Sequence, residues 1–314
     1  MSTGRKTILC EGAAAADAGL AVVGGDGAVL AACSLWWSEV PAHPGRSLGA
    51  IGAFSSTGAR AATELIRDAC RRLADRGCTL AVAPMDGNTW AAHRFVTASS
   101  GRPPFFLEPW NPPEWPRHFE DDGWVPLSRY SSSTLTLPTC EPDEGPAERA
   151  ASRLEAAGVT IRSLNPDAFD EELRSIHAVS RVSFAQNFLY TPIGYEAFSK
   201  LYRKVQPVVI PELVLMAEQA GAPAGFAFGI PDRLQAPGSR ERAVIVKTLA
   251  VLPERRFAGL GSALVSRLQT TAARLGFTEA IHALQFENNA SLRITARHRA
   301  DKFREYTLYS KELV

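Results

Sequence analysis

Hydrophobic residues along the first half of the chain are spaced as in alternating strands and helices. One segment has apolar residues at every third or fourth position, which predicts a helix over 61–76 that ends at Gly77. A shorter helix is predicted over 115–122, after a proline-rich loop at 103–116. Short apolar runs bounded by turn residues predict strands at 21–23, 28–35, 48–54, 79–83 and 124–137.

The second half repeats this order of elements. Apolar runs predict strands at 159–164, 213–217, 225–230, 243–251, 279–286 and 303–313. Helical spacing predicts helices at 166–179, 198–205, 261–275 and 290–297. In both halves a hairpin leads to a strand, a helix that ends at glycine, a strand, a helix and a strand. The pattern indicates an α/β protein with an internal duplication that retains little residue identity.

A polar segment separates the two halves. Residues 138–146 contain three prolines and three acidic residues and show no apolar periodicity. We therefore expect a first domain over 1–137, a linker over 138–150 and a second domain over 151–314.

Charge and composition narrow the range of partners and compartments. The chain has 34 Lys+Arg against 33 Asp+Glu, so its net charge does not favour binding to nucleic acid or an anionic membrane. Any anion that it binds must be held by groups at the binding site itself. No run of about 18 apolar residues predicts a membrane span, and the N-terminus lacks the apolar stretch of a secretory signal. Five cysteines without metal-ligand spacing predict reduced thiols, a cytoplasmic location and no metal site.

One turn carries candidate binding chemistry. The sequence Arg256-Phe-Ala-Gly259-Leu-Gly261 follows a predicted strand and opens a predicted helix. Unpaired N–H groups at a helix start can hold a phosphate, and glycines allow a ligand to approach the main chain closely. The same spacing also suits a tight turn before a packed helix.

In its wider context, this turn resembles the acyl-CoA-binding region of GNAT-type N-acetyltransferases. The resemblance comprises the strand, the turn 256–261, the helix, the next strand and Asn288-Asn-Ala-Ser291. It covers 243–297 and extends from about 159 to the end. It implies two GNAT-like domains in tandem, each with a central mixed sheet flanked by helices, and acetyl-CoA or another acyl-CoA as ligand. The implied binding residues are Leu249, Ala250, Val251, Arg256, Phe257, Ala258, Gly259, Leu260, Gly261, Ser262, Asn288 and Ser291.

The sequence departs from this family at several places, of which two bear on catalysis and on the first domain. Many members carry a tyrosine seven residues after the asparagine as the acid for the leaving thiolate, and here that position is Thr295. Tyr306 or Tyr309 on the last strand, or a water molecule, would have to replace it. In the first half, Arg60 stands where the second glycine of the turn belongs. We therefore expect the first domain to be a degenerate copy that does not bind coenzyme A.

Candidate acceptor residues surround the same region. An amine must lose a proton before it attacks a thioester, and Glu287, at the end of a strand, is a candidate base or a solvated turn carboxylate. His282 is expected to be buried and hydrogen-bonded. Lys247 could hold an anionic acceptor, pair with Glu287 or face an edge. The segment 183–192 suits either an acceptor pocket or a loop packed on the sheet, and its candidate pocket residues are Asn187, Tyr190 and Thr191.

The resemblance implies an acyl-CoA-dependent N-acetyltransferase that transfers acetyl directly to a small-molecule amine. A backbone N–H near 249–251 would meet the oxyanion. The first half could close the acceptor pocket with the loop 103–116 and the pair Trp36-Trp37, although aromatic pairs more often belong to a core. Acyl transfer to a protein or carrier-bound acceptor, and an acyl-CoA-binding module without turnover, remain alternatives. The acceptor and the oligomeric state stay open.

Overall fold

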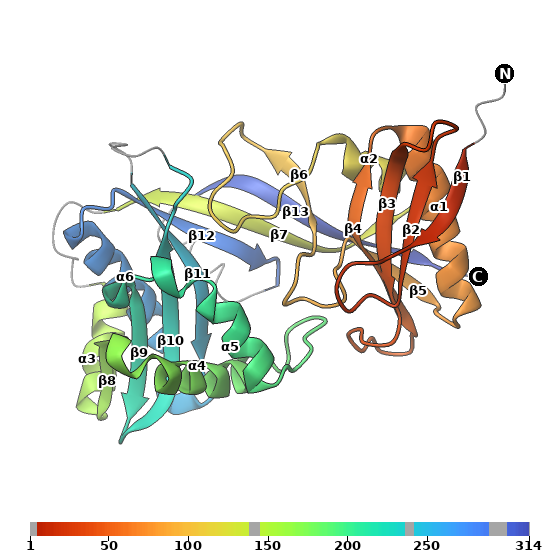
Figure 1. Cartoon of the computed structure of the whole chain (residues 1–314). Coiled ribbons are helices and arrows are strands. Elements are labelled where there is room, and N and C mark those ends of the chain that lie inside the picture. Colours follow the sequence, from red (N-terminus) through yellow and green to blue (C-terminus); the bar gives the residue numbers. More distant parts are fainter. Residues whose placement is uncertain (1–4, 138–144, 236–241, 289–299, 314) are drawn as a thin grey trace.

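The computed structural model describes residues 5–137, 145–235, 242–288 and 300–313. Its strands form one continuous sheet in the order β1-β2-β3-β4-β5-β13-β7-β12-β11-β10-β9-β8, and β6 pairs with β13 beside this path (Figure 1). The strands are β1 (Lys6–Cys10), β2 (Ala18–Val23), β3 (Val29–Trp36), β4 (Leu48–Ser56), β5 (Leu80–Ala83), β6 (Phe95–Ser99), β7 (Val125–Thr136), β8 (Val159–Ser163), β9 (Val214–Gln219), β10 (Ala222–Pro231), β11 (Ala243–Val251), β12 (Glu279–Phe286) and β13 (Asp301–Glu312). The helices are α1 (Ala59–Asp75), α2 (Glu114–Asp121), α3 (Pro146–Ala156), α4 (Phe169–Ser183), α5 (Tyr195–Arg203) and α6 (Leu260–Arg274).

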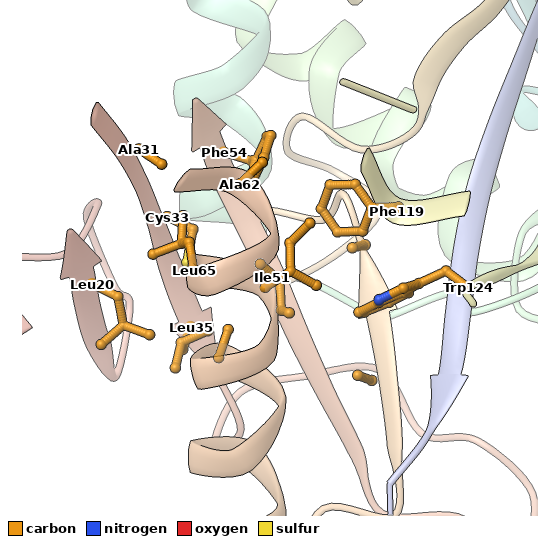
Figure 2. Packing of buried hydrophobic residues seen from close by; sticks show 14 of the residues in the cluster. Leu20, Ala31, Cys33, Leu35, Ile51, Phe54, Ala62, Leu65, Phe119 and Trp124 are labelled. Atoms are coloured by element: carbon orange, nitrogen blue, oxygen red, sulfur yellow. The ribbon is translucent and has the colours of Figure 1, made fainter. Parts of the chain in front are cut away.

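The N-terminal half packs α1 against β1–β5. The apolar face predicted for this helix is fully buried at Leu65, Ile66, Ala69 and Leu73. These side chains meet inward-facing residues of the strands, as well as the rings of α2 and the segment after it (Figure 2). The helix predicted over 61–76 is confirmed, because its periodicity is a local property of the sequence.

The C-terminal half is covered by helices on both faces. α4 and α5 pack on one face of β9–β12 through residues such as Ile176 and Phe198. α6 and α3 pack on the other face through residues such as Leu264 and Leu154. The sequence did not predict α3, which begins with a proline in its first turn, inside the segment assigned to a linker.

The two halves exchange their last strands. β7, from the first half, pairs with β12, and β13, from the end of the chain, pairs with β5. β7 and β13 also pair with each other along most of their length. The C-terminus therefore lies beside the N-terminal half (Figure 1). The domain division at 138–150 stays a prediction, and the pairing shows that each half completes its sheet with a strand of the other.

Two further sequence expectations concern membranes and thiols. Across the residues that the structure describes, no helix has the length and apolar character needed to span a bilayer. Cys10, Cys33, Cys70 and Cys78 carry free thiols, and Cys140 lies outside the described residues.

Candidate functional site

The site begins where two parallel strands separate. β11 and β12 pair only over Ala243–Val246 and Glu279–His282. Lys247 is an extra residue of β11, inserted between the pairs Val246–Gly229 and Thr248–Phe228. Such a bulge bends a strand and changes the direction of its side chains. The separation leaves the edge of β11 after Val246 without a strand partner on the β12 side.

β12 is bulged at the same level. Between its pairs with Ser133 and Ser131 of β7, the two residues Ala283 and Leu284 oppose the single residue Ser132. Leu284 has a φ of 57°, and its N–H donates to Ser132 Oγ at 3.1 Å. Regular alternation along a strand would place His282 and Leu284 on the same face, and the bulge breaks this alternation.

A cavity of about 590 Å³ lies between the separated strands and the start of α6. We call it the strand cavity. Its walls include many of the residues that the family resemblance implied, together with Ser183, Phe184 and Asn187 from the end of α4 and the following turn. The implied residues that line it are Leu249, Ala250, Val251, Phe257, Gly259 and Gly261. The Val251 carbonyl is already bound, because Ser183 Oγ donates to it at 2.8 Å.

The turn before α6 presents free N–H groups. Gly259 caps the helix with a φ of 87°, and the first N–H bonded within the helix is that of Ala263, to Gly259 O at 3.1 Å. The N–H groups of Leu260, Gly261 and Ser262 therefore have no partner within the helix, and they lie at the positive end of its dipole.

The other residues of the turn have structural roles. The N–H groups of Phe257 and Ala258 donate to Glu254 O and Arg255 O at 2.9 and 3.1 Å, and the Phe257 ring is buried. Arg256 is exposed and forms an ion pair with Glu254 at 2.8 Å. A Cβ atom on Gly259 would stand 2.9 Å from Cβ of Ala150 in α3, so α3 closes the turn from outside.

These features fit coenzyme A. Free N–H groups at a helix start suit its pyrophosphate, and the unpaired edge of β11 suits an extended arm with amide groups. The cavity volume lies within the usual range for small-molecule sites. Asn288 is exposed and lines none of the three cavities described in this section. Ser291 and Thr295 lie outside the described residues.

The equivalent separation of β4 and β5 in the N-terminal half is filled by protein. These strands pair only over Leu48–Ala50 and Leu80–Val82. Beyond that point the Met85 N–H donates to Ile51 O at 2.9 Å, and the Asp86 carboxylate accepts from the Ala53 N–H at 2.6 Å. A Cβ atom on Gly52 would collide with both Met85 and Asp86.

Two more cavities adjoin the strand cavity, and residues of both halves line each of them. The small cavity, of about 240 Å³, is bounded by His93, Arg94, Tyr130, Phe188 and Tyr190 among others. The shared cavity, of about 620 Å³, extends from Lys247 and Phe228 to the loop 107–109. Thr248 and Leu284 line all three cavities, so the spaces meet at the bulges of β11 and β12.

Three of the four predicted acceptor residues line cavities that meet at this junction, and Thr191 lines none of the three. Asn187 lines the strand and small cavities, and Lys247 lines the strand and shared cavities. The Tyr190 hydroxyl and Thr191 Oγ1 are buried without a hydrogen-bond partner among the described residues. Residues 107–109 of the loop 103–116 line the shared cavity. Trp36 is buried in the core, and Trp37 packs against the N-terminal core.

The titratable groups at the junction have shifted pKa values. Burial, followed by the nearby Arg94 charge, lowers the pKa of Lys247 to about 8. Burial and the same arginine lower the pKa of His93 to about 3, so this imidazole is neutral near pH 7. Burial raises the pKa of Tyr202 to about 12, and the Tyr202 hydroxyl is hydrogen-bonded to Thr248. Sequence reasoning missed Arg94 and His93, because they come from the first half and carry no motif.

The three residues chosen as catalytic from the sequence lie away from the cavities. Glu287 is exposed after β12, and its Oε1 accepts from the Arg129 N–H at 3.0 Å. Tyr309 is buried in the N-terminal core, donates to Glu120 at 2.5 Å and has its pKa raised by burial. Tyr306 is buried behind Glu108, and burial raises its pKa as well. None of them lines the three cavities, and their catalytic roles stay a prediction. His282 is buried and bonded to Gln269 at 2.9 Å, as expected.

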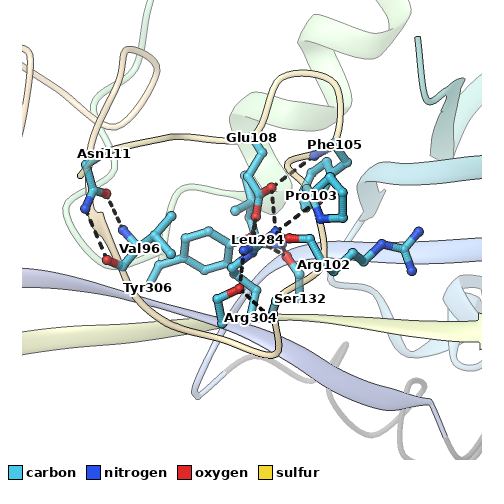
Figure 3. A network of polar contacts seen from close by, with 12 residues as sticks. Val96, Arg102, Pro103, Phe105, Glu108, Asn111, Ser132, Leu284, Arg304 and Tyr306 are labelled. Atoms are coloured by element: carbon cyan, nitrogen blue, oxygen red, sulfur yellow. Dashed lines mark hydrogen bonds and ion pairs between the residues drawn. The ribbon is translucent and has the colours of Figure 1, made fainter. Parts of the chain in front are cut away.

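Glu108, which lines the shared cavity, belongs to a buried polar network (Figure 3). Its carboxylate accepts from Arg304 Nε at 2.9 Å, from the Phe105 N–H at 3.0 Å and from the Tyr306 hydroxyl. Arg304 is fully buried and also donates to Ser99 Oγ and to two backbone carbonyls of the loop. This carboxylate is therefore committed to holding the loop against β13.

Comparison with known proteins finds a family match over the region that contains this site. The acetyltransferase (GNAT) family profile matches residues 186–298, which include the separated strands and the turn before α6. The chain carries a GNAT-family acetyltransferase domain. No curated protein matches this chain by sequence. The GNAT resemblance read from the sequence is confirmed.

Solved structures show the GNAT fold over nearly the whole chain. A GCN5-related N-acetyltransferase from Sphaerobacter thermophilus is 16% identical with a TM-score of 0.54, covering 94% of this chain and 80% of that one. A tandem GNAT protein from the clavulanic acid biosynthesis pathway is 14% identical with a TM-score of 0.51, and the match covers 98% of this chain and 84% of that one. A glucosamine N-acetyltransferase region of a fungal multi-domain β-N-acetylglucosaminidase is 12% identical with a TM-score of 0.57, and the match covers 94% of this chain and 33% of that one. The mixed α/β fold expected from the sequence is confirmed.

Proposed function

We propose that this protein transfers the acetyl group of acetyl-CoA to the amine of a small molecule. One observation carries the proposal. The strand cavity, with its free N–H groups at the start of α6, meets the shared cavity at Thr248 and Leu284. A donor held along β11 would therefore present its thioester to an acceptor held between the two halves.

The donor site is formed by the C-terminal half alone. The N–H groups of Leu260, Gly261 and Ser262 would bind the pyrophosphate, and Arg256 would add a charge at the rim. Leu249 and Ala250 border the path of the arm. When bound, acetyl-CoA supplies an activated acyl group. Asp86 and Met85 fill the equivalent space in the N-terminal half, so we assign one donor site to each chain.

The acceptor site favours a small molecule. The shared cavity is lined by the loops 89–94 and 107–109 of the first half and by α5 and β10–β12 of the second. Its volume of about 620 Å³ is typical of sites for small ligands.

Lys247 is the group placed to handle the proton. It lines both the donor and the acceptor cavity, and a pKa of about 8 leaves part of it neutral near pH 8. Neutral Lys247 would accept one proton from the ammonium group of the acceptor, which leaves a free amine to attack the thioester. The new C–N bond forms as the C–S bond breaks, the proton on Lys247 passes to the leaving thiolate, and the second proton of the nitrogen is released to water. The lysine returns to its starting state.

The test measures acceptor-dependent release of free thiol from acetyl-CoA by the full chain, with a panel of small amines. We expect turnover in the wild type and at least about a hundredfold loss in Lys247→Met, the effect of removing a general base. Donor affinity should be retained in that variant. Gly259→Val should lose donor binding, because a side chain there meets Ala150 and is strained at its φ of 87°. Gly221→Val is the matched control, with a φ of 77° and open space around its Cβ. Donor binding without release of thiol for every amine would contradict catalysis.

A further inference from the structure

We propose that the acceptor carries an anionic group, a carboxylate or a phosphate, which binds to Arg94 in the cavities between the two halves. This inference refines the proposed function by naming the class of acceptor. It concerns binding, however, so it can be tested separately from acyl transfer.

Arg94 is a buried cation without a counter-ion among the residues that the structure describes. It lies between β5 and β6 and lines both the small and the shared cavity. Its guanidinium carbon stands 3.9 Å from the centre of the Tyr130 ring. Nη2 is 2.5 Å from His93 Nε2, whereas Nε and Nη1 are buried and have no hydrogen-bond partner among the described residues. Burying such a donor without an acceptor costs free energy, so its retention points to a ligand.

Among the described residues, the one hydrogen-bond partner of this guanidinium is a neutral imidazole. His93 Nδ1 lies 2.9 Å from the Ala91 carbonyl and donates to it, which leaves Nε2 as the acceptor facing Arg94. The low pKa of His93 agrees with this arrangement, because a protonated ring would place two cations in contact. The histidine therefore orients Arg94 and does not neutralise it.

The remaining charges around the cavities leave this region positive. Among the described residues that line the small and shared cavities, Glu108 is the only acid, and Arg304 already pairs with it at 2.9 Å. Lys247 and Lys204 also line the shared cavity. The chain has a net charge of +1, so this concentration of cations is local. An anion that reaches Arg94 from the cavity would supply the missing charge and the missing acceptors.

The rest of the lining describes the other parts of the acceptor. Trp90, Tyr202 and Phe228 give the shared cavity an aromatic wall. Lys247 lines the shared cavity and also the strand cavity where the thioester is expected. The arrangement suits an amine directed toward Lys247, an anion directed toward Arg94 and an apolar body between the aromatic rings.

The test compares matched ligands by calorimetric titration of the full chain without acetyl-CoA. One pair is L-phenylalanine and phenethylamine, which differ by a carboxylate. The other pair is O-phosphoethanolamine and ethanolamine, which differ by a phosphate. We expect at least about tenfold tighter binding of the anionic member in one pair, the effect of a hydrogen bond to a charged group. The pair that shows it identifies the anion. No preference in either pair would overturn the proposal.

Arg94→Met provides the second arm. It should abolish the preference for the anionic ligand while leaving acetyl-CoA affinity unchanged. Because it removes an uncompensated buried charge, it should also leave the urea midpoint of unfolding unchanged or higher. Arg117→Met, at an exposed position outside the cavities, is the control and should change neither property. An anion preference that survives Arg94→Met, or a large drop in the urea midpoint, would overturn the assignment. Anion binding without any acyl transfer would instead contradict the proposed function alone.

Discussion

Replacing Glu108 by glutamine should destabilise the protein strongly. The ion pair of Glu108 with Arg304 is almost completely buried, with side-chain exposures of 0% and 1%. Removing one partner of a buried pair leaves the other charge uncompensated and costs about 3–5 kcal/mol. Arg304 would keep Ser99 Oγ and the carbonyls of Arg102 and Pro103 as neutral acceptors. We therefore expect a loss near the lower end, about 3 kcal/mol in the free energy of unfolding.

The assay is urea unfolding followed by far-UV circular dichroism, with Glu114→Gln as the control. Glu114 is exposed in the first turn of α2, so its replacement should change the free energy of unfolding by less than about 0.5 kcal/mol. A loss below about 1 kcal/mol in Glu108→Gln would refute the reasoning. Unchanged stability with lost turnover would instead make Glu108 a group that acts on the ligand.

Three further predictions concern pH and the exchanged strands. Between pH 8 and 10.5 the folded state holds Lys247 neutral while the unfolded state still binds its proton, so stability relative to Lys247→Met should rise with pH in urea titrations. As pH falls from 6.5 to 3 the unfolded state protonates His93 and the folded state does not. Stability relative to His93→Asn should therefore fall over that window, and a constant difference would contradict the burial of this ring. Deleting residues 300–314 removes β13, so hydrogen exchange should increase in β5 (Leu80–Ala83) of the first half, and protection there equal to that of the full chain would contradict the exchange.

The sequence predicted elements whose pattern is local. The helix expected over 61–76 is α1 (Ala59–Asp75), and the strand expected over 279–286 is β12 (Glu279–Phe286). α3 (Pro146–Ala156) was missed because the prolines and acids before it suggested a linker. The strand exchange was also missed, because the pairing partner of a strand depends on contacts far along the chain. The apolar pattern of β13 is compatible with pairing to β5 or to β12, so the pattern does not identify its partner.

The same distinction applies to the site. The donor turn was predictable because Gly259 and Gly261 lie in one continuous segment between a strand and a helix. Arg94 could not be found, since it reaches the site from the other half of the chain. Tyr306 and Glu287 were placed near the site by their strand positions alone. Pleat direction and the bulge at Leu284 decide where side chains point, and neither is visible in the hydrophobic pattern.

The central claim is that each chain has one acetyl-CoA site, formed by the turn before α6 and the edge of β11. Calorimetric titration of the purified protein with acetyl-CoA tests it most directly, because the titration reports stoichiometry and affinity together. We predict one site per chain, lost in Gly259→Val and kept in Gly221→Val. Two sites per chain would contradict the conclusion that Met85 and Asp86 fill the space between β4 and β5. No binding, or binding that survives Gly259→Val, would contradict the donor site itself.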